Sequence, residues 1–188
     1  MTTTIKTLFP KETPLIDNTK KTVTLQSTAF DTFLAKAIAE KKRTGPATRL
    51  ETAMLSLNAR GTSIERAYVC QKRHTDTHSS RVPSYTCQVA EKAQAAGMIS
   101  QTNTQFKPLQ TVSRIEAYSI MMKSICVHPV TNANNWQKEV IKKAMQLGFT
   151  VRNLNTFEPD KPLLIPEMYA VVKRLNDYAK EHNTCEVF

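Results

Sequence analysis

The four cysteines of this chain, Cys70, Cys87, Cys126 and Cys185, have the clearest chemistry. An even set of this size allows three full disulfide pairings. Each cysteine falls at the end of an expected helix, and an antiparallel helix pair would bring Cys87 next to Cys126. These positions favour the pairs Cys87–Cys126 and Cys70–Cys185, which would form in an oxidising compartment. The alternative is four reduced, buried thiols in a cytosolic protein.

The segment His74-Thr75-Asp76-Thr77-His78 offers side chains that could bind a metal. No cysteine lies close enough in sequence to complete a tetrahedral site, and the surrounding residues are rich in serine and threonine. A solvated loop is therefore the favoured interpretation. The chain also has no phosphate-binding loop, dinucleotide fingerprint, zinc-protease motif or nucleophile signature. We expect a protein without enzymatic activity, with no catalytic residue, no cofactor and no bound metal.

Three glutamates are better explained as helix caps than as general acids. Thr48-Arg49-Leu50-Glu51 and Ser113-Arg114-Ile115-Glu116 each place a hydroxyl three residues before a glutamate, which is the capping box. In Leu164-Ile165-Pro166-Glu167 the capping hydroxyl is missing, but proline is tolerated in a first turn. Helices are therefore expected to begin near residues 49, 114 and 165.

A competing capping box occurs at Thr62-Ser63-Ile64-Glu65. We prefer Thr48–Glu51 as the start of the main helix, because Gly45-Pro46 precedes it and the apolar residues Ala53, Met54 and Leu57 follow. The second box would then open an extra helix through Tyr68 and Val69.

These caps belong to a unit that occurs twice, at a spacing of 51 residues. Tyr85–Tyr118 overlays Trp136–Tyr169 without a gap, with eight identical positions among 34. The identical pairs are Val89/Val140, Lys92/Lys143, Ala93/Ala144, Gly97/Gly148, Phe106/Phe157, Pro108/Pro159, Glu116/Glu167 and Tyr118/Tyr169. A repeat of this kind indicates one supersecondary unit that buries its apolar face against its neighbours. Such proteins usually bind or assemble.

Each copy reads as helix, loop, helix. The first helix carries an apolar stripe (Tyr85, Val89 and Ala93 in one copy; Trp136, Val140, Ile141, Ala144 and Leu147 in the other). It ends at a glycine that can adopt the left-handed conformation, Gly97 or Gly148. A Phe-x-Pro loop follows, in which the phenylalanine can plug the helix pair. The second helix then carries Ile115, Tyr118, Met122 and Ile125, or Tyr169, Val172, Leu175 and Tyr178. Trp136 and Met121-Met122 are assigned to the core.

A third, degenerate copy precedes these two. Its first helix is expected over 30–42 and its second begins at the Thr48–Glu51 box. The chain thus divides into an extended N-terminal arm (1–29), a degenerate repeat with the extra helix (30–81) and two regular repeats (82–130 and 131–188). The predicted fold class is all-α.

These residues resemble the S-layer homology domain, whose pattern is an aromatic-led helix ending in glycine, a Phe-x-Pro loop and a second helix opening with Thr-Arg-Ala-Glu. The resemblance covers roughly residues 30–182. It implies three repeats around a pseudo-threefold axis with a helical bundle at the centre. It also implies anchoring to anionic, often pyruvylated, cell-wall polysaccharide in grooves lined by the motif arginine. That role would fall on Arg49 and Arg114, whereas Ile165 replaces the arginine in the last copy.

The net charge of +10 suits an anionic partner such as a wall polymer or nucleic acid. Nucleic acid is the less favoured, because most aromatic side chains fall on apolar stripes and are not free to stack on bases. No run of 18 apolar residues is present, so no membrane span is expected. The first residues lack the apolar core of a signal peptide, so either the protein is not exported or the chain is a mature form or one with an added methionine.

The arm contains Pro10, Pro14 and the β-prone run 22–25, and it could add a strap to a neighbouring subunit. The sequence therefore predicts a structural, non-catalytic subunit, extracellular or at the cell surface, that self-assembles into an S-layer, filament or sheath. Its principal partner would be copies of itself. The alternative is a basic binding module for an anionic polymer.

Overall fold

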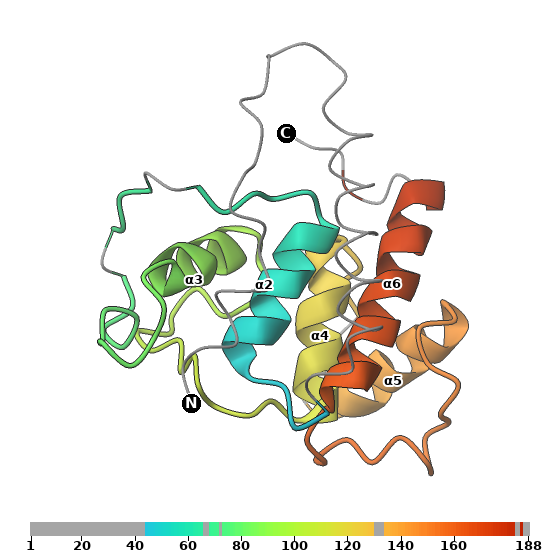
Figure 1. Ribbon diagram of the computed structural model, residues 1–188. Coiled ribbons are helices and arrows are strands. Elements are labelled where there is room, and N and C mark those ends of the chain that lie inside the picture. Colours follow the sequence, from blue (N-terminus) through green and yellow to red (C-terminus); the bar gives the residue numbers. More distant parts are fainter. Residues whose placement is uncertain (1–43, 66–67, 72, 130–133, 183–184, 186–188) are drawn as a thin grey trace.

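The computed structural model describes residues 44–65, 68–71, 73–129, 134–182 and 185 (Figure 1). The regular elements among these residues are five helices: α2 (Arg49–Ala59), α3 (Thr86–Ala95), α4 (Arg114–Ser124), α5 (Trp136–Gln146) and α6 (Ile165–His182). Within these residues the extended segments form isolated bridges rather than strands. The all-α prediction is thus confirmed. The arm 1–29 and the helix expected over 30–42 lie outside the described residues.

The helices begin where the sequence places their caps. Thr48 makes the full capping box with Glu51 before α2, because its hydroxyl accepts from the Glu51 amide and its own amide donates to the Glu51 carboxylate. Ser113 caps α4 through the Glu116 amide at 3.3 Å, and the Glu116 carboxylate is directed elsewhere. Gly97 (φ 68°) and Gly148 (φ 70°) end α3 and α5 in the left-handed conformation, as predicted.

The two Phe-x-Pro loops share one backbone conformation. Phe106 and Phe157 are fully buried, which confirms their role as plugs. The residue after each phenylalanine has a positive φ, 56° at Lys107 and 52° at Glu158. Only a few per cent of non-glycine residues adopt such a conformation, so its recurrence at a spacing of 51 marks the same turn built twice.

A closed ring of backbone hydrogen bonds joins the segments that lead into α2, α4 and α6. The Ala47 amide donates to Leu163 (2.8 Å), the Leu163 amide to Val112 (3.1 Å) and the Val112 amide to Ala47 (3.1 Å). All three side chains are fully buried. Isolated antiparallel bridges flank this ring at Pro46–Leu164, Thr48–Thr111 and Ser113–Pro162. Three segments far apart in the sequence therefore depend on one another for their backbone bonds.

The core consists of two hydrophobic clusters, and all three ring residues belong to one of them. One joins α2 and α3 with Met98, Phe106 and Ile120. The other joins α4, α5 and α6 with the plug Phe157, and it includes Ala47 and Leu55. The segment that contains α2 thus contributes to both clusters, and Figure 1 shows α2 between α3 on one side and α4 and α6 on the other.

Two sequence predictions are wrong at this level. Residues 62–65 and 68–71 are not helical, so the extra helix after the Thr62 box is absent from the described part of that segment. Lys92 instead holds this stretch in place by donating to the Ser63 carbonyl at 2.9 Å and pairing with Glu65 at 2.6 Å. Trp136, assigned to the core, is exposed, because it begins α5 at the edge of the packed face. The pseudo-threefold arrangement of whole repeats stays a prediction.

Candidate functional site

Arg114, one of the two arginines assigned to glycan binding, is only 4% exposed. It stands in the first turn of α4, where the Ser113 cap fixes its backbone. Its Nε donates to Glu167 Oε1 at 2.9 Å and its Nη2 to Glu167 Oε2 at 3.1 Å, a bidentate pair. Its Nη1 donates to the carbonyls of Phe157 (2.5 Å) and Glu158 (3.1 Å). The guanidinium is therefore bound on all three nitrogens, and it locks the start of α6 and the Phe157 turn to α4.

Arg49 occupies the same motif position at the start of α2 and pairs with Glu116 of α4. Its side chain is 15% exposed, and its Nε is buried with no hydrogen-bond partner among the described residues. Arg49 is thus more accessible than Arg114 and less completely bonded.

A polar hollow of about 300 Å³ lies beside Glu116. It is lined by Gln110, Thr111, Val112, Ser113, Glu116, Asp160 and Pro162. Two of these residues are carboxylates, which would repel an anion inside the hollow.

The two ion pairs follow one rule: the arginine of each motif binds the glutamate of the next motif along the chain. Arg49 binds Glu116 and Arg114 binds Glu167. At the third position Ile165 stands where the arginine would be, and it is buried. The remaining glutamate, Glu51, accepts from the amide and hydroxyl of Thr48. At this position α6 therefore carries a buried apolar side chain in place of the motif arginine.

The four cysteines form two disulfides, Cys70–Cys87 and Cys126–Cys185. The Cα atoms are 6.1 and 5.6 Å apart, within the range of native bridges. The predicted pairing Cys87–Cys126 with Cys70–Cys185 is wrong. It assumed that Cys70 closes a helix, but Cys70 lies in a loop beside the start of α3. The Cys185 sulfur lies 3.8 Å from the Ser124 carbonyl oxygen at the end of α4.

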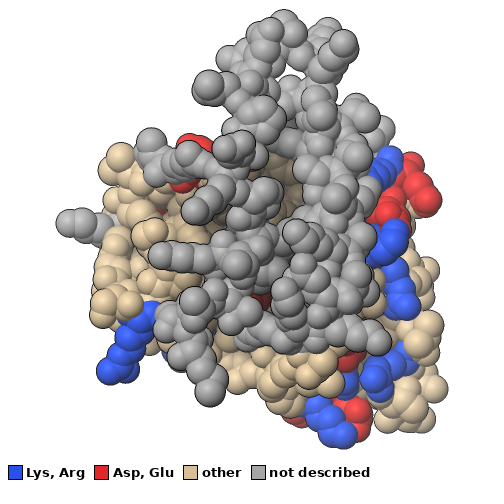
Figure 2. All heavy atoms as spheres, viewed as in Figure 1, with Lys and Arg blue, Asp and Glu red and all other residues tan. Residues whose placement is uncertain are grey.

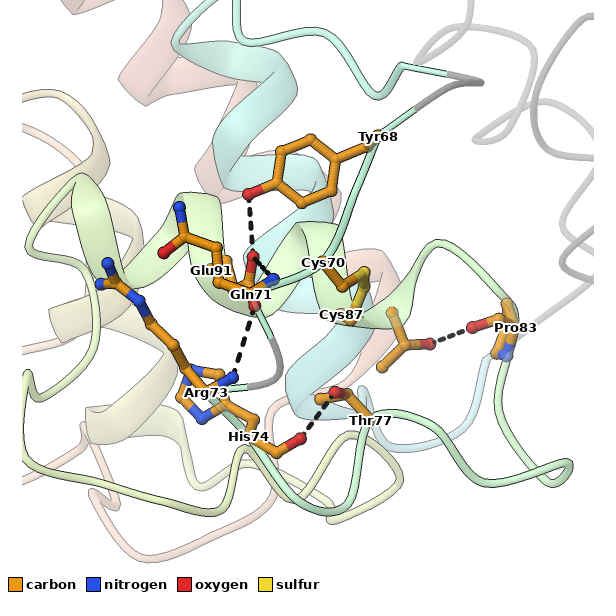
Figure 3. The surroundings of a disulfide bond; sticks show 10 residues. Tyr68, Cys70, Gln71, Arg73, His74, Thr77, Pro83, Cys87 and Glu91 are labelled. Atoms are coloured by element: carbon orange, nitrogen blue, oxygen red, sulfur yellow. Dashed lines mark hydrogen bonds between the residues drawn. A yellow bond between two sulfur atoms is a disulfide. The ribbon is translucent and has the colours of Figure 1, made fainter.

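The carboxylate of Glu91 fastens the loop that carries Cys70 (Figure 3). It accepts from the Tyr68 hydroxyl at 2.9 Å, the Gln71 amide at 3.1 Å and the Arg73 amide at 3.5 Å. Glu91 projects from α3 and is buried, so burial is compensated by three donors. Burial is the larger cause that raises the pKa of Tyr68, and the hydrogen bond to Glu91 raises it further.

The segment expected to be a solvated loop is partly buried. His74 and Thr77 are buried, and His74 faces the Phe106 ring with 6.2 Å between the ring centroids. Asp76 accepts from the backbone amides of Phe106 (2.9 Å) and Lys107 (2.6 Å). The loop therefore supports the first Phe-x-Pro turn. Among the described residues, no group of three histidine, cysteine or acidic side chains is placed to hold a metal ion.

Tyr85 and Glu51 are electrostatically coupled at the α2–α3 contact. Burial, and then the Glu51 carboxylate, raises the pKa of Tyr85 to about 12. The phenol thus stays neutral where its ionisation would place a second negative charge close to Glu51.

On the face shown in Figure 2, basic and acidic side chains alternate over α5 and α6. Lys142 pairs with Glu139 at 3.1 Å, and Lys173 pairs with Asp177 at 2.8 Å. This described surface carries both signs of charge in close pairs.

No protein-family model and no curated protein matches this chain. The resemblance to the S-layer homology domain therefore stays a prediction. Among the described helices, none is both long enough and apolar enough to cross a membrane.

Proposed function

We propose that this protein is a structural, non-catalytic subunit that self-assembles outside the cell or at its surface. The proposal rests on one observation above all: the side chains best suited to ligand chemistry are engaged in contacts within the chain. Arg114 is buried against Glu167, Glu91 fastens a loop, and all four cysteines are in disulfides. Such residues rigidify a building block.

The large apolar side chains that remain exposed support assembly. Seven are exposed in the described residues: Val69, Leu109, Trp136, Met145, Val151, Leu154 and Leu164. Four of the seven belong to α5 and the loop that follows it, and Val151 is 91% exposed. Exposed apolar surface of this kind marks protein contacts when it is contiguous.

The two disulfides support the location. Disulfides form and persist in oxidising compartments, which include the extracellular space and the cell surface. The fold-stabilising bridges of a subunit exposed outside the cell also reduce its dependence on a large hydrophobic core.

The test is electron microscopy of the purified protein over a range of concentrations, with light scattering on the same samples. We expect regular filaments, tubes or sheets as the concentration rises. A protein that stays strictly monomeric at high concentration would exclude a self-assembling subunit.

A second candidate is a basic module that binds an anionic polymer, and the net charge of +10 and Arg49 favour it. The Arg49 side chain is 15% exposed, so its guanidinium can meet a carboxylate at the surface through atoms other than the buried Nε. Arg114 would first have to leave Glu167.

Binding to pyruvylated wall polysaccharide distinguishes this candidate. Specific recognition predicts that Arg49→Ala weakens binding far more than Arg152→Ala, whose parent side chain is 40% exposed. Equal losses that disappear at high salt, or equal affinity for RNA, would identify non-specific charge attraction instead.

A further inference from the structure

Helix α2 is enclosed on all sides, although it is a short helix near the beginning of the described chain. Eight consecutive residues, from Leu50 to Leu57, are buried. A helix with one outer face would bury only a stripe, so burial around the whole circumference means that α2 fills the space between other elements. Among the described helices, its neighbours are α3, α4 and α6.

The two disulfides cross-link the part of the chain that contains α3 to α6, and neither of them includes α2. The Cys70–Cys87 bridge closes 17 residues and the Cys126–Cys185 bridge closes 59, and both lie within residues 70–185. Helices α3 to α6 therefore belong to a body with two covalent cross-links. The connection from α2 to this body is the stretch 60–69, which contains no cysteine.

That connection is long relative to the helix it carries. Ten residues can span roughly 33 Å when extended. The 11 residues of α2 occupy only about 16 Å along the helix axis. Once its contacts with Lys92 and Glu91 are released, the stretch 60–69 is long enough to carry α2 beyond its own body to a neighbouring copy.

The α2 segment is held by hydrogen bonds, an ion pair and a sulfur contact to residues of the disulfide-linked part of the chain, 70–185. The Arg49 side chain pairs with Glu116, and the Arg49 backbone amide donates to the Gln110 carbonyl (2.9 Å). The Leu50 amide donates to the Pro108 carbonyl (3.1 Å). The Ala47 segment bonds to Val112 and Leu163, and Thr52 contacts the Met168 sulfur at 3.5 Å. We call these partners the α2 contact surface: Pro108, Gln110, Val112, Glu116, Leu163 and Met168. Every copy of the chain presents the same surface.

We propose that the segment 45–59 of one copy occupies the α2 contact surface of the next, so that subunits are joined by exchange of α2. The contacts are identical within and between chains, and concentration then shifts the balance toward exchange. Because each copy has one α2 to donate and one surface to receive it, one-way exchange continues from subunit to subunit and gives an open-ended polymer. This inference rests on the proposed self-assembly and names its interface.

Three backbone bridges allow a direct test. Pro46–Leu164 and Thr48–Thr111 join the α2 segment to the body, whereas Ser113–Pro162 lies wholly within the body. In each bridge the backbone hydrogen bonds are made by the residues on either side of the bridged pair. The bridged residues are therefore a non-hydrogen-bonded antiparallel pair, in which the side chains lie closer together than in a hydrogen-bonded pair. Pro46, Thr111, Leu164 and Pro162 are exposed, so cysteines there leave the core intact.

The experiment compares the double variants Pro46→Cys/Leu164→Cys, Thr48→Cys/Thr111→Cys and Ser113→Cys/Pro162→Cys in the full chain. Each is oxidised after assembly, separated on a denaturing gel without reductant and mapped by peptide mass spectrometry. Exchange predicts ladders of covalently linked chains for the first two pairs and single chains for the Ser113/Pro162 control. Oxidation of Pro46→Cys/Leu164→Cys in dilute monomer should fix α2 to its own body and prevent assembly.

A mixture of the single variants Pro46→Cys and Leu164→Cys provides an independent readout. Exchange predicts a heterodimeric cross-link between residues 46 and 164 in the assembled mixture. Assemblies in which both α2 pairs link only within one chain would overturn the exchange and leave the proposed self-assembly standing. Interchain links at 46–164 but not at 48–111 would also overturn it, because α2 carries both positions. A protein that never assembles would overturn both proposals.

Discussion

The guanidinium of Arg114 grips the carboxylate of Glu167 through two parallel hydrogen bonds, from Nε at 2.9 Å and from Nη2 at 3.1 Å. The two residues are 53 positions apart, and each stands in the first turn of its helix. A fork of this geometry aligns α4 with α6 and leaves the arginine little freedom. The motif arginine thus serves to fasten one helical repeat to the next.

Replacing Arg114 with alanine should strongly destabilise the fold. The change removes a buried guanidinium and leaves two carbonyls and the Glu167 carboxylate, which is 19% exposed, without that donor. Breaking a fully buried pair costs about 3–5 kcal/mol, which is the upper limit here. Arg152→Ala is the matched control, because Arg152 approaches the same Glu167 at 3.8 Å but is 40% exposed, and its loss should cost less than about 1 kcal/mol. Urea unfolding of both variants measures the difference, and equal losses would contradict the interlock.

Peptide mapping without reductant should recover Cys70 linked to Cys87 and Cys126 linked to Cys185. Removing the second bridge should cost more, because it closes 59 residues and the first closes 17. Loop entropy gives about 4 kcal/mol for Cys126→Ala/Cys185→Ala and about 3 kcal/mol for Cys70→Ala/Cys87→Ala. Denaturant unfolding of the two double variants tests the order, and the reverse order would show that loop entropy does not dominate.

Glu91→Gln should loosen the loop around Cys70 and leave the rest of the fold intact. The amide replaces a charged acceptor of three hydrogen bonds, and the loss should be about 1–3 kcal/mol. Hydrogen exchange should accelerate at the amides of Gln71 and Arg73, which the carboxylate now protects. Tyr68→Phe, which removes one donor only, should have the smaller effect, and unchanged exchange in Glu91→Gln would rule out the clamp.

The phenol of Tyr85 should ionise at about pH 12 in the folded protein. Its pKa is raised above the value in the unfolded chain, so its contribution to stability is complete below about pH 10. That contribution is lost as the pH rises through about 12. Tyr85→Phe should therefore show a shallower fall of stability over this range. It should also lack one late step in the phenolate absorbance titration, and an unaltered titration would refute the assignment.

The helices could be predicted because their signals are local. The 3.6-residue stripe ending at Gly148 and the hydroxyl of Thr48 act within one or two turns, and both are confirmed. The partner of Arg114 was beyond such reasoning, because it depends on how the repeats pack. One signal was present all the same: each motif arginine is followed by a motif glutamate in the next copy, and the ion pairs join those residues.

The predicted cysteine pairing and the predicted exposure of the His74 loop were wrong because both depend on contacts between residues far apart in the sequence. The prediction gave Cys70 a helix, but the loop crosses α3, and its path depends on Glu91, which nothing in the local sequence connects to Tyr68 or Gln71. His74 lies in a polar stretch without a helical or strand period, so its hydropathy predicted a solvent-exposed loop. Its burial follows from Asp76, which binds the backbone of a turn 30 residues further along.

The ring formed by Ala47, Val112 and Leu163 also governs when this chain can finish folding as it is made. Thr52 meets Met168 beside that ring, 116 positions later in the sequence. At ~5–20 residues per second, a ribosome needs on the order of ten seconds to bridge that interval. Throughout that time the α2 segment lacks the α6 residues that later pack against it. Helices α3 and α4 are made first and can cover part of α2. The side of α2 that contacts α6 would stay open to chaperones, and to the same segment of neighbouring nascent chains, until α6 arrives.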